Sequence, residues 1–255
     1  MRRFVIDQIP SEDDKVTICG SEARHIARVL RMKPTDHLIL MDTQGKRYEA
    51  IIVSACPTSV ELKLLNPVAN PENPLLHMTL CQAALKAKAM DLVIQKATEL
   101  GVTRIIPFSS ERSVIRLQGN RMENKLRHWR EIARNATAQS DRTRPPEILP
   151  MVSFDKVLEM GTEPEALGII LWEQERSADL KSILREQGSK KKKIIGVVGP
   201  EGGFSTHEIE LATKAGFVPV TLGKRILRAE TAAMVLCTLC LYEWGDLGLP
   251  ESNTA

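Results

Sequence analysis

The sequence predicts an α/β protein with a parallel sheet in a large carboxyl-terminal domain, preceded by a small β-barrel. From residue 76 onward, strand-like apolar runs alternate with helical patterns, which is typical of β-α-β units and a parallel sheet covered on both faces. Before that point the chain carries several short strands and one helix. Residues 67–74, rich in Pro and Asn, resemble a linker. We therefore expect domains over residues 1–72 and 73–250.

In the first domain, strands are expected at residues 2–6, 15–19, 37–41, 47–54 and 60–65. Gln44-Gly45 predicts a turn between the third and fourth of these strands. Ser21 is expected to cap a helix that runs to about Met32. Its apolar face would carry Ile26, Val29 and Leu30.

That helix also carries basic residues. Three of its arginines fall at i, i+4 and i+7 and would form one stripe, with a histidine beside them. Such a stripe can lie along a phosphate backbone, and the alternative is a solubilising face. Two further arginines lie at the start of the chain, which favours the phosphate interpretation. The residues expected to contact phosphates in this domain are Arg2, Arg3, Arg24, His25, Arg28 and Arg31.

In the second domain, strands are expected at residues 78–84, 104–108, 147–151, 167–172, 194–199 and 218–222. Helices are expected at 89–100, ended by Gly101, and at 121–140, with Leu126, Trp129, Ala133 and Ala136 on its apolar stripe. Residues 232–242 are apolar all round, which predicts a helix buried in the core or in a dimer interface.

The whole chain has a net charge of +3, too mild to prove a nucleic-acid partner. Between Arg112 and Arg144, however, nine Arg or Lys face only three Asp or Glu, a local net charge of +6. Such a patch is expected of a phosphate-binding surface, and a solvated helix face is an equal alternative. Arg134 and Arg142 are the phosphate-binding candidates in this region.

Composition excludes other classes of protein. No apolar run is long enough to span a membrane. The five cysteines are scattered and no signal peptide precedes them, so we expect a reducing, cytoplasmic location. Cys237 and Cys240 have the spacing of a metal site but lie in an apolar helix without a second pair or a nearby histidine. We therefore expect buried packing there and no metal.

Two buried strands of the second domain end in unusual loops. The first runs into GPEGGF at 199–204, followed by Ser205 and Glu208 at the spacing of a capping box. The second runs into GKRILRAET at 223–231. Glycines let a ligand approach the backbone, and the carboxyl edge of a parallel sheet is where open α/β sheets bind ligands. A plain strand-to-helix turn is the alternative, and neither the Walker nor the G-x-G-x-x-G spacing occurs.

These two loops resemble those of the RsmE-type 16S rRNA uridine-N3 methyltransferases, members of the SPOUT class of knotted methyltransferases. The resemblance also spans nearly the whole chain, since it covers residues 95–102, Pro107, residues 110–113, Gln139-Ser140, Arg142 and Pro146, and at the amino end Arg2-Arg3-Phe4, His25 and Val29-Leu30-Arg31. One departure is Ala138, because family members commonly carry an acid directly before the Gln-Ser pair.

The resemblance implies a PUA-like RNA-binding barrel over residues 1–72 and a trefoil-knot methyltransferase domain over residues 73–250. It implies S-adenosyl-L-methionine as cofactor, 16S rRNA of the small ribosomal subunit as substrate, and a homodimer whose interface helps build the cofactor site. The residues expected to hold the cofactor are Leu171, Glu173, Gly199, Pro200, Glu201, Gly202, Gly203, Leu222, Gly223, Leu227, Arg228, Thr231 and Ala232.

Four residues of these loops are candidates for the chemistry that the resemblance implies. Glu201 and Glu230 are candidate bases for the uracil N3 proton, and Arg228 and Arg112 are candidate stabilisers of the uridinate charge. Glu230 is equally expected as an ion-pair partner that holds Arg228. Two other functions stay open: a nucleotide-binding enzyme that uses residues 199–205 for phosphate, and a non-catalytic RNA-binding protein.

Overall fold

The computed structural model describes residues 1–10, 15–69, 74–113, 120–163, 165–187 and 191–248. The chain divides into two compact units. Unit 1 comprises Met1–Glu72 and Arg134–Pro145, and unit 2 comprises Asn73–Ala133 and Pro146–Ala255. Unit 1 thus includes the segment Arg134–Pro145, which the sequence pattern assigned to the second domain. The assignment of independent domains over 1–72 and 73–250 stays a prediction.

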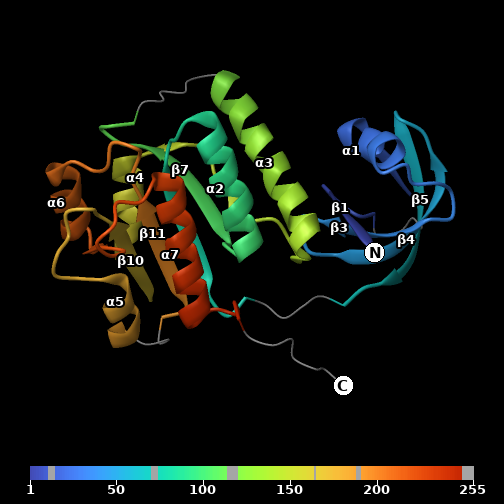
Figure 1. Cartoon of the computed structure of the whole chain (residues 1–255). Helices are drawn as coiled ribbons and strands as arrows, with labels where there is room; N and C mark the ends of the chain where they lie inside the picture. Colours follow the sequence, from blue (N-terminus) through green and yellow to red (C-terminus); the bar gives the residue numbers. More distant parts are fainter. Residues whose placement is uncertain (11–14, 70–73, 114–119, 164, 188–190, 249–255) are drawn as a thin grey trace. The chain divides into compact units, whose positions relative to one another are not determined.

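Unit 1 is built on a five-stranded sheet in the order β1-β3-β4-β5-β2. The strands are β1 Arg2–Ile6, β2 Lys15–Cys19, β3 His37–Asp42, β4 Arg47–Ala55 and β5 Ser59–Pro67. β1 pairs with β3 in parallel, and the other pairs are antiparallel. The strands curve around a core that includes Phe4, Ile18, Leu40 and Leu62 (Figure 1). All five expected strands are present.

The expected turn between β3 and β4 is confirmed, and Asp42 stabilises it. Its carboxylate accepts hydrogen bonds from Gln44 N at 2.9 Å and from Lys46 N at 2.8 Å. Gly45 has a φ of 91°, a conformation that residues with a side chain rarely adopt. A buried aspartate therefore fixes the register of the hairpin.

The helix of unit 1 differs from the expectation. α1 spans Gly20–Arg24 with Cys19 as its N-cap residue, so the predicted cap at Ser21 is wrong. A π-helix follows over His25–Val29. Because a π-turn is wider than an α-turn, it changes which side chains face the core: Ile26 is buried, whereas Val29 is 68% exposed rather than apolar-facing as predicted.

Arg31 lies beyond this helix, with a φ of 51°. The predicted stripe of three arginines on one helical face is therefore wrong for Arg31. Arg24 and Arg28 remain on the helical segment, and both are exposed.

Unit 2 is built on a sheet in the order β12-β10-β11-β6-β7-β8, with β9 paired to β7. The strands are β6 His77–Ala83, β7 Arg104–Ser109, β8 Glu147–Ile148, β9 Val152–Ser153, β10 Ala166–Leu171, β11 Lys193–Val198 and β12 Val218–Val220. Every pairing between these strands is parallel, as predicted. The single strand expected over 147–151 is two short ones, because Pro150 lacks the N–H that a ladder needs.

Helices cover both faces of this sheet. They are α2 Ala87–Leu100, α3 Asn120–Ser140, α4 Phe154–Leu158, a 3₁₀-helix Glu159–Thr162, α5 Leu180–Gln187, α6 Thr206–Lys214 and α7 Ala229–Trp244. α2, α5, α7 and the first part of α3 share one core with the sheet, and α4 and α6 share the core on the other face. Figure 1 shows α2 and α7 side by side in front of the sheet.

The predicted packing of the two cysteines in α7 is confirmed. Cys237 and Cys240 are fully buried in the core shared with α2. Burial raises the pKa of the Cys237 thiol to about 12, so the thiol stays protonated at neutral pH. In the part of the chain that the structure describes, no helix is long and apolar enough to cross a bilayer. The trefoil knot stays a prediction.

Candidate functional site at the carboxyl edge of the parallel sheet

Three strand ends meet in unit 2, because β10 lies between β11 and β12. Ile170 pairs with Val197 of β11, and Leu171 pairs with Val220 of β12. Since all three strands are parallel, their carboxyl ends lie at the same edge of the sheet. The glycine loop (residues 199–204), the arginine loop (residues 222–228) and the β10 end (Leu171 to Glu173) are therefore neighbours.

The glycine loop turns tightly and packs closely against its surroundings. Gly203 has a φ of 66°, and its N–H donates to Pro200 O at 3.0 Å. A Cβ built on Gly203 would lie 2.8 Å from Glu173 Oε1, and one on Gly202 would lie 3.3 Å from Arg112 Cβ. Side chains at these two positions would thus displace Glu173 or Arg112.

The capping box at the start of α6 is confirmed. Ser205 Oγ accepts a hydrogen bond from Glu208 N at 3.2 Å, and Glu208 Oε2 accepts one from Ser205 N at 2.9 Å. The second carboxylate oxygen, Oε1, accepts a hydrogen bond from Glu111 N at 3.0 Å. Glu208 therefore also contacts the serine loop (residues 110–113) that follows β7, a contact that the sequence did not predict.

Glu201 and Arg112, two of the four residues expected to take part in the chemistry, make hydrogen bonds to the backbone of other segments. Glu201 Oε1 accepts a hydrogen bond of 3.2 Å from Lys86 N, at the N-cap of α2. Arg112 Nη1 donates a hydrogen bond of 3.1 Å to Gly202 O. A carboxylate at a helix N-terminus is favoured by the helix dipole, so Glu201 has a structural role there.

The other two candidates lie at the start of α7. Arg228 is the exposed N-cap residue, and Glu230 is half-buried in the first turn. Among the described residues, no ion pair or side-chain hydrogen bond joins Arg228 to Glu230. The bracing role of Glu230 stays a prediction, and the Arg228 side chain is exposed at this edge.

The second residue of the arginine loop is a glycine whose backbone has a positive φ. Gly223 has a φ of 115°, and its N–H donates to Thr221 Oγ1 at 3.2 Å. Leu222 and Leu227 are half-buried, as are Thr231 and Ala232 in the first turn of α7. The loop therefore offers apolar side chains and a glycine backbone to a ligand at this edge.

Hydrogen bonds to the Glu175 carboxylate stabilise the segment after β10. Its Oε1 accepts hydrogen bonds from Ser177 Oγ at 2.6 Å and Ser177 N at 2.7 Å. The Ser177 hydroxyl, with the neighbouring backbone N–H groups, lowers the pKa of the Glu175 carboxyl to about 2. Arg176 Nη1 donates to Glu173 O at 2.8 Å. These contacts fix the backbone that carries Glu173.

Gln82 is a buried polar residue that the sequence reasoning missed. It is the last residue but one of β6, and its Nε2 donates to Ala83 O at 3.1 Å and lies 3.3 Å from Gly199 O. Gln82 is fully buried. A polar residue beside the apolar residues Leu80, Cys81 and Ala83 is the signal that could have found it. Gln82 fixes the start of the glycine loop.

A hollow of about 700 Å³ lies beside the serine loop. Its lining includes Ser110, Ser113, Met151, His207 and Glu208. The serine loop therefore contributes both to this hollow and, through Arg112, to the glycine loop.

The expected RNA-binding residues of unit 1 fall into two groups. Arg2, Arg24, Arg28 and Arg31 are exposed. His25 is half-buried and packs edge-on against the Phe4 ring.

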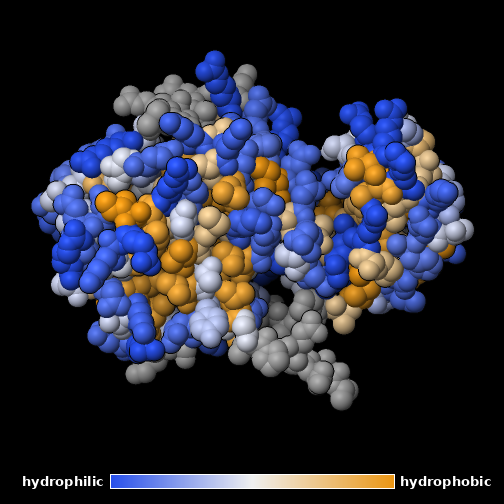
Figure 2. Space-filling model, in the orientation of Figure 1, coloured by the Kyte–Doolittle hydropathy of each residue, from blue (hydrophilic) through white to orange (hydrophobic). Residues whose placement is uncertain are grey.

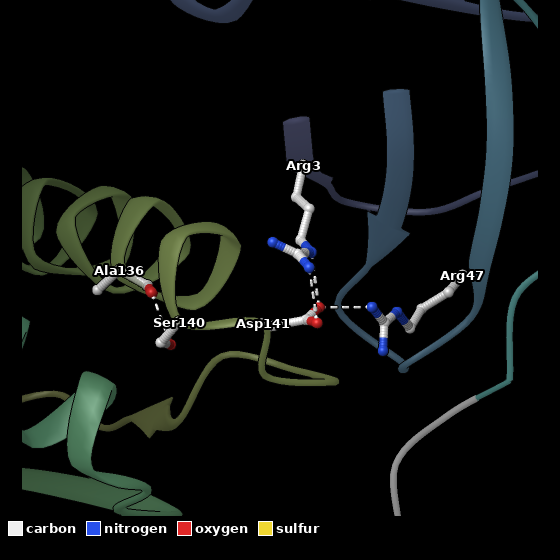
Figure 3. Close-up of polar contacts among 5 residues, drawn as sticks. All are labelled: Arg3, Arg47, Ala136, Ser140 and Asp141. Carbon is white, nitrogen blue, oxygen red and sulfur yellow. Dashed lines mark hydrogen bonds and ion pairs between the residues drawn. The ribbon is translucent and has the colours of Figure 1, made fainter. Parts of the chain in front are cut away.

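The other group is engaged in ion pairs. Arg3 contacts the Asp141 carboxylate, which also receives Arg47, as Figure 3 shows. Arg134 pairs with Asp7. Arg3 and Arg134 therefore help attach the segment Arg134–Pro145 to the sheet of unit 1. Arg142, in that segment, is half-buried.

Within the described ranges, no group of three or more His, Cys, Asp or Glu side chains is placed to hold a metal ion.

Two family models match the chain. One is described as an RNA methyltransferase domain and covers residues 71–241, and the other is an RNA methyltransferase PUA domain covering residues 18–65. Curated relatives named ribosomal RNA small subunit methyltransferase E include one from Mesomycoplasma hyopneumoniae, 35% identical over 95% of this chain and 100% of its own length. Another, from Mycobacterium tuberculosis, is 30% identical over 91% of this chain and 88% of its own.

A solved structure is also similar to this chain over nearly its whole length. The ribosomal RNA small subunit methyltransferase E from Neisseria gonorrhoeae, bound to S-adenosyl methionine, is 33% identical. It superposes with a TM-score of 0.86 over 96% of this chain and 99% of that one.

Proposed function

Because this chain belongs to the family of ribosomal RNA small subunit methyltransferases E, we propose that it methylates N3 of one uridine in 16S rRNA, with S-adenosylmethionine as methyl donor. The observation that carries this proposal is the meeting of the glycine loop, the arginine loop and the β10 end at the carboxyl edge of one parallel sheet. The substrate would be the small ribosomal subunit or its RNA, which implies action in the cytoplasm.

The loops of unit 2 fit such a donor. At Gly203 the backbone can be approached closely because it lacks a side chain, and the Glu173 carboxylate lies directly beside it. We propose that the ligand is held by Leu171, Glu173, residues 199–203, Leu222, Gly223, Leu227, Arg228, Thr231 and Ala232. When bound, S-adenosylmethionine supplies a methyl group on a positively charged sulfur, so that its carbon is open to attack.

The chain's own residues must remove the proton from uracil N3 and stabilise the charge that this leaves. Uracil N3 is a nucleophile only after it loses its proton; its lone pair would then take the methyl group, and the carbon–sulfur bond would break to release S-adenosylhomocysteine. We propose that a carboxylate oxygen of Glu230 accepts that proton and that the Arg228 guanidinium stabilises the negative charge on the uracil carbonyls. Glu201 and Arg112 are engaged with Lys86 and Gly202, so they position the loops.

Two further assignments belong to this proposal. Unit 1 would be the PUA-like RNA-binding part, with Arg2, Arg24, Arg28 and Arg31 as phosphate contacts. A second copy of the chain would cover the exposed apolar side chains of α2 and α7, namely Leu92, Leu239 and Tyr242. Figure 2 shows apolar residues gathered over these helices. An apolar face on a helix that already fills the core on its other side favours a dimer interface.

A thermal-shift comparison tests the cofactor part of the proposal. S-adenosylhomocysteine should raise the melting temperature, and ATP and GTP should leave it unchanged. A shift with ATP or GTP would favour a nucleotide-binding enzyme. No shift with any of the three would favour an RNA-binding protein without catalysis. Gly202→Val is the matched variant, because a side chain there would press on Arg112, and it should abolish the shift.

A further inference from the structure

Arg112 contacts a loop that is not its neighbour in the sheet. It follows β7, whereas Gly202, whose carbonyl it contacts at 3.1 Å, follows β11. The strand between them in the sheet order is β6. The serine loop must therefore be held across the end of β6 for this contact to form.

Aromatic packing fixes one end of each of the two loops. Phe108, near the end of β7, stacks on Phe204, the last residue of the glycine loop, with ring centroids 6.3 Å apart and planes at 4°. Phe154 packs against both rings. Both stacked rings are fully buried. This packing positions the ends of the loops, and its three rings belong to Phe108, Phe154 and Phe204 rather than to the residues of the serine loop.

Glu208 supplies the missing connection. Its side chain is almost fully buried, with 2% of the residue exposed. Oε1 accepts the Glu111 N–H at 3.0 Å, and Oε2 accepts the Ser205 N–H at 2.9 Å. One carboxylate thus joins the residue directly before Arg112 to the residue directly after Phe204. Both of its partners are donors, so both positions need an acceptor oxygen.

We propose that Glu208 is a positioning residue, whose carboxylate holds the serine loop against the start of α6 and thereby keeps Arg112 on the Gly202 carbonyl. The role rests on the proposed methyltransferase function and goes beyond helix capping. An amide would not replace the carboxylate, because its NH₂ group would face a backbone N–H and leave that buried donor unpaired.

The chain offers a matched control for this proposal. Glu208→Gln should break one of the two contacts, whereas Ser205→Ala removes only the hydroxyl that accepts from Glu208 N and leaves the bond to Glu111 intact. Both variants weaken the cap of α6. A role limited to capping therefore predicts similar behaviour for the two.

Amide hydrogen exchange on the ligand-free protein is the first measurement. In Glu208→Gln, exchange at residues 109–113 should accelerate at least about tenfold, while Ser205→Ala should leave it at the wild-type rate. Glu208→Ala, which removes both acceptor oxygens, should have the same effect, and exchange at these residues equal to that of Ser205→Ala in both Glu208 variants would overturn the proposal. This result does not depend on methylation, so it stands even if the proposed function fails. Should Glu208→Gln not fold, Glu208→Asp, too short to reach both donors, takes its place.

A double-mutant cycle on the reaction is the second measurement. At saturating S-adenosylmethionine, Glu208→Gln should slow single-turnover methylation about tenfold or more, and Ser205→Ala should stay within about threefold of wild type. In an Arg112→Ala background the Glu208→Gln effect should disappear, because Glu208 acts through Arg112. Additive effects would overturn the proposal. A wild-type protein that binds no S-adenosylmethionine would instead refute the proposed function.

Discussion

Arg3 Nη2 donates a hydrogen bond of 2.7 Å to Asp141 Oδ2, although the two residues lie 138 positions apart. Arg47 Nη2 lies 2.5 Å from the other carboxylate oxygen, and the Arg47 side chain is only 5% exposed. Ala138, on the same segment, packs against Val5, Ile39 and Met41. One carboxylate between two guanidinium groups therefore fastens the segment Arg134–Pro145 to the sheet of unit 1 (Figure 3).

This clamp predicts a measurable loss of stability. Asp141→Asn keeps the shape and tolerates the φ of 58° at this position, but it leaves the buried Arg47 without a charged partner. Because Asp141 is 45% exposed, we expect a loss of about 1–3 kcal/mol in the free energy of unfolding in urea, less than for a fully buried pair. Asp7→Asn is the control. Its 81% exposed carboxylate pairs with Arg134, and its loss should cost under about 1 kcal/mol. Equal losses in the two variants would refute the clamp.

RNA binding should depend on the exposed arginines of unit 1. Charge reversal at Arg24 and Arg28 should weaken binding to small-subunit RNA and lower the salt slope by about one for each lost phosphate contact. Affinity for S-adenosylmethionine should stay unchanged. Arg3→Ala should weaken RNA binding less than Arg24→Ala, because Arg3 is already paired with Asp141. Arg185→Glu, at an exposed position on α5, controls for net charge. A parallel loss of cofactor affinity would contradict this division of roles.

Arg228 is predicted to act on the reaction itself. Arg228→Ala should slow single-turnover methylation by about 10²–10³-fold, a far larger effect than its loss of cofactor affinity, because the uridinate charge develops only as the proton leaves. Higher pH should recover part of the rate. If Arg228 instead braced its loop through Glu230, cofactor affinity would fall and Glu230→Ala would reproduce the defect. A full-rate Arg228→Ala enzyme would exclude both roles and leave Arg112 as the candidate.

The Glu175 hydrogen bonds predict a pH dependence. The pKa of this carboxyl is lowered to about 2 in the folded protein, from a usual value of 4.5. A depressed folded pKa contributes stability that is fully present above the unfolded pKa and is lost as the pH falls through the folded pKa. The protection factors of the amides at residues 175–178, which compare exchange with that of an unstructured chain at the same pH, should therefore stay constant from pH 7 to about 5 and fall toward pH 2. Glu175→Gln should exchange faster already at pH 7. Equal rates in both proteins at pH 7 would contradict the assignment.

Local patterns sufficed for much of the fold. Apolar runs predicted the parallel strands of unit 2, and Ser205 with Glu208 predicted the capping box at the start of α6. Local patterns failed where a residue responds to distant neighbours. The π-helix over His25–Val29 turns Val29 outward, and nothing in the sequence around it distinguishes a π-turn from an α-turn.

In the candidate site, too, local patterns predicted some features and missed those that depend on distant residues. The sequence placed the glycine and arginine loops at one edge because parallel strands end together. It did not show which charged groups are already engaged. Glu201 is held by Lys86 N and Arg3 by Asp141, and both partners lie more than 100 residues away in the sequence. Long-range pairs of this kind follow from the packing of whole elements, which periodicity does not encode.

The most direct test of the proposed function is nucleoside analysis of 16S rRNA after reaction. Purified small ribosomal subunits lacking the modification would be incubated with the protein and S-adenosylmethionine, and their RNA digested and examined by mass spectrometry. The account predicts one 3-methyluridine per 16S rRNA with the wild-type protein and none with Gly202→Val. A methyl group on another atom or another nucleoside, or no methylation by a protein that binds S-adenosylmethionine, would contradict it.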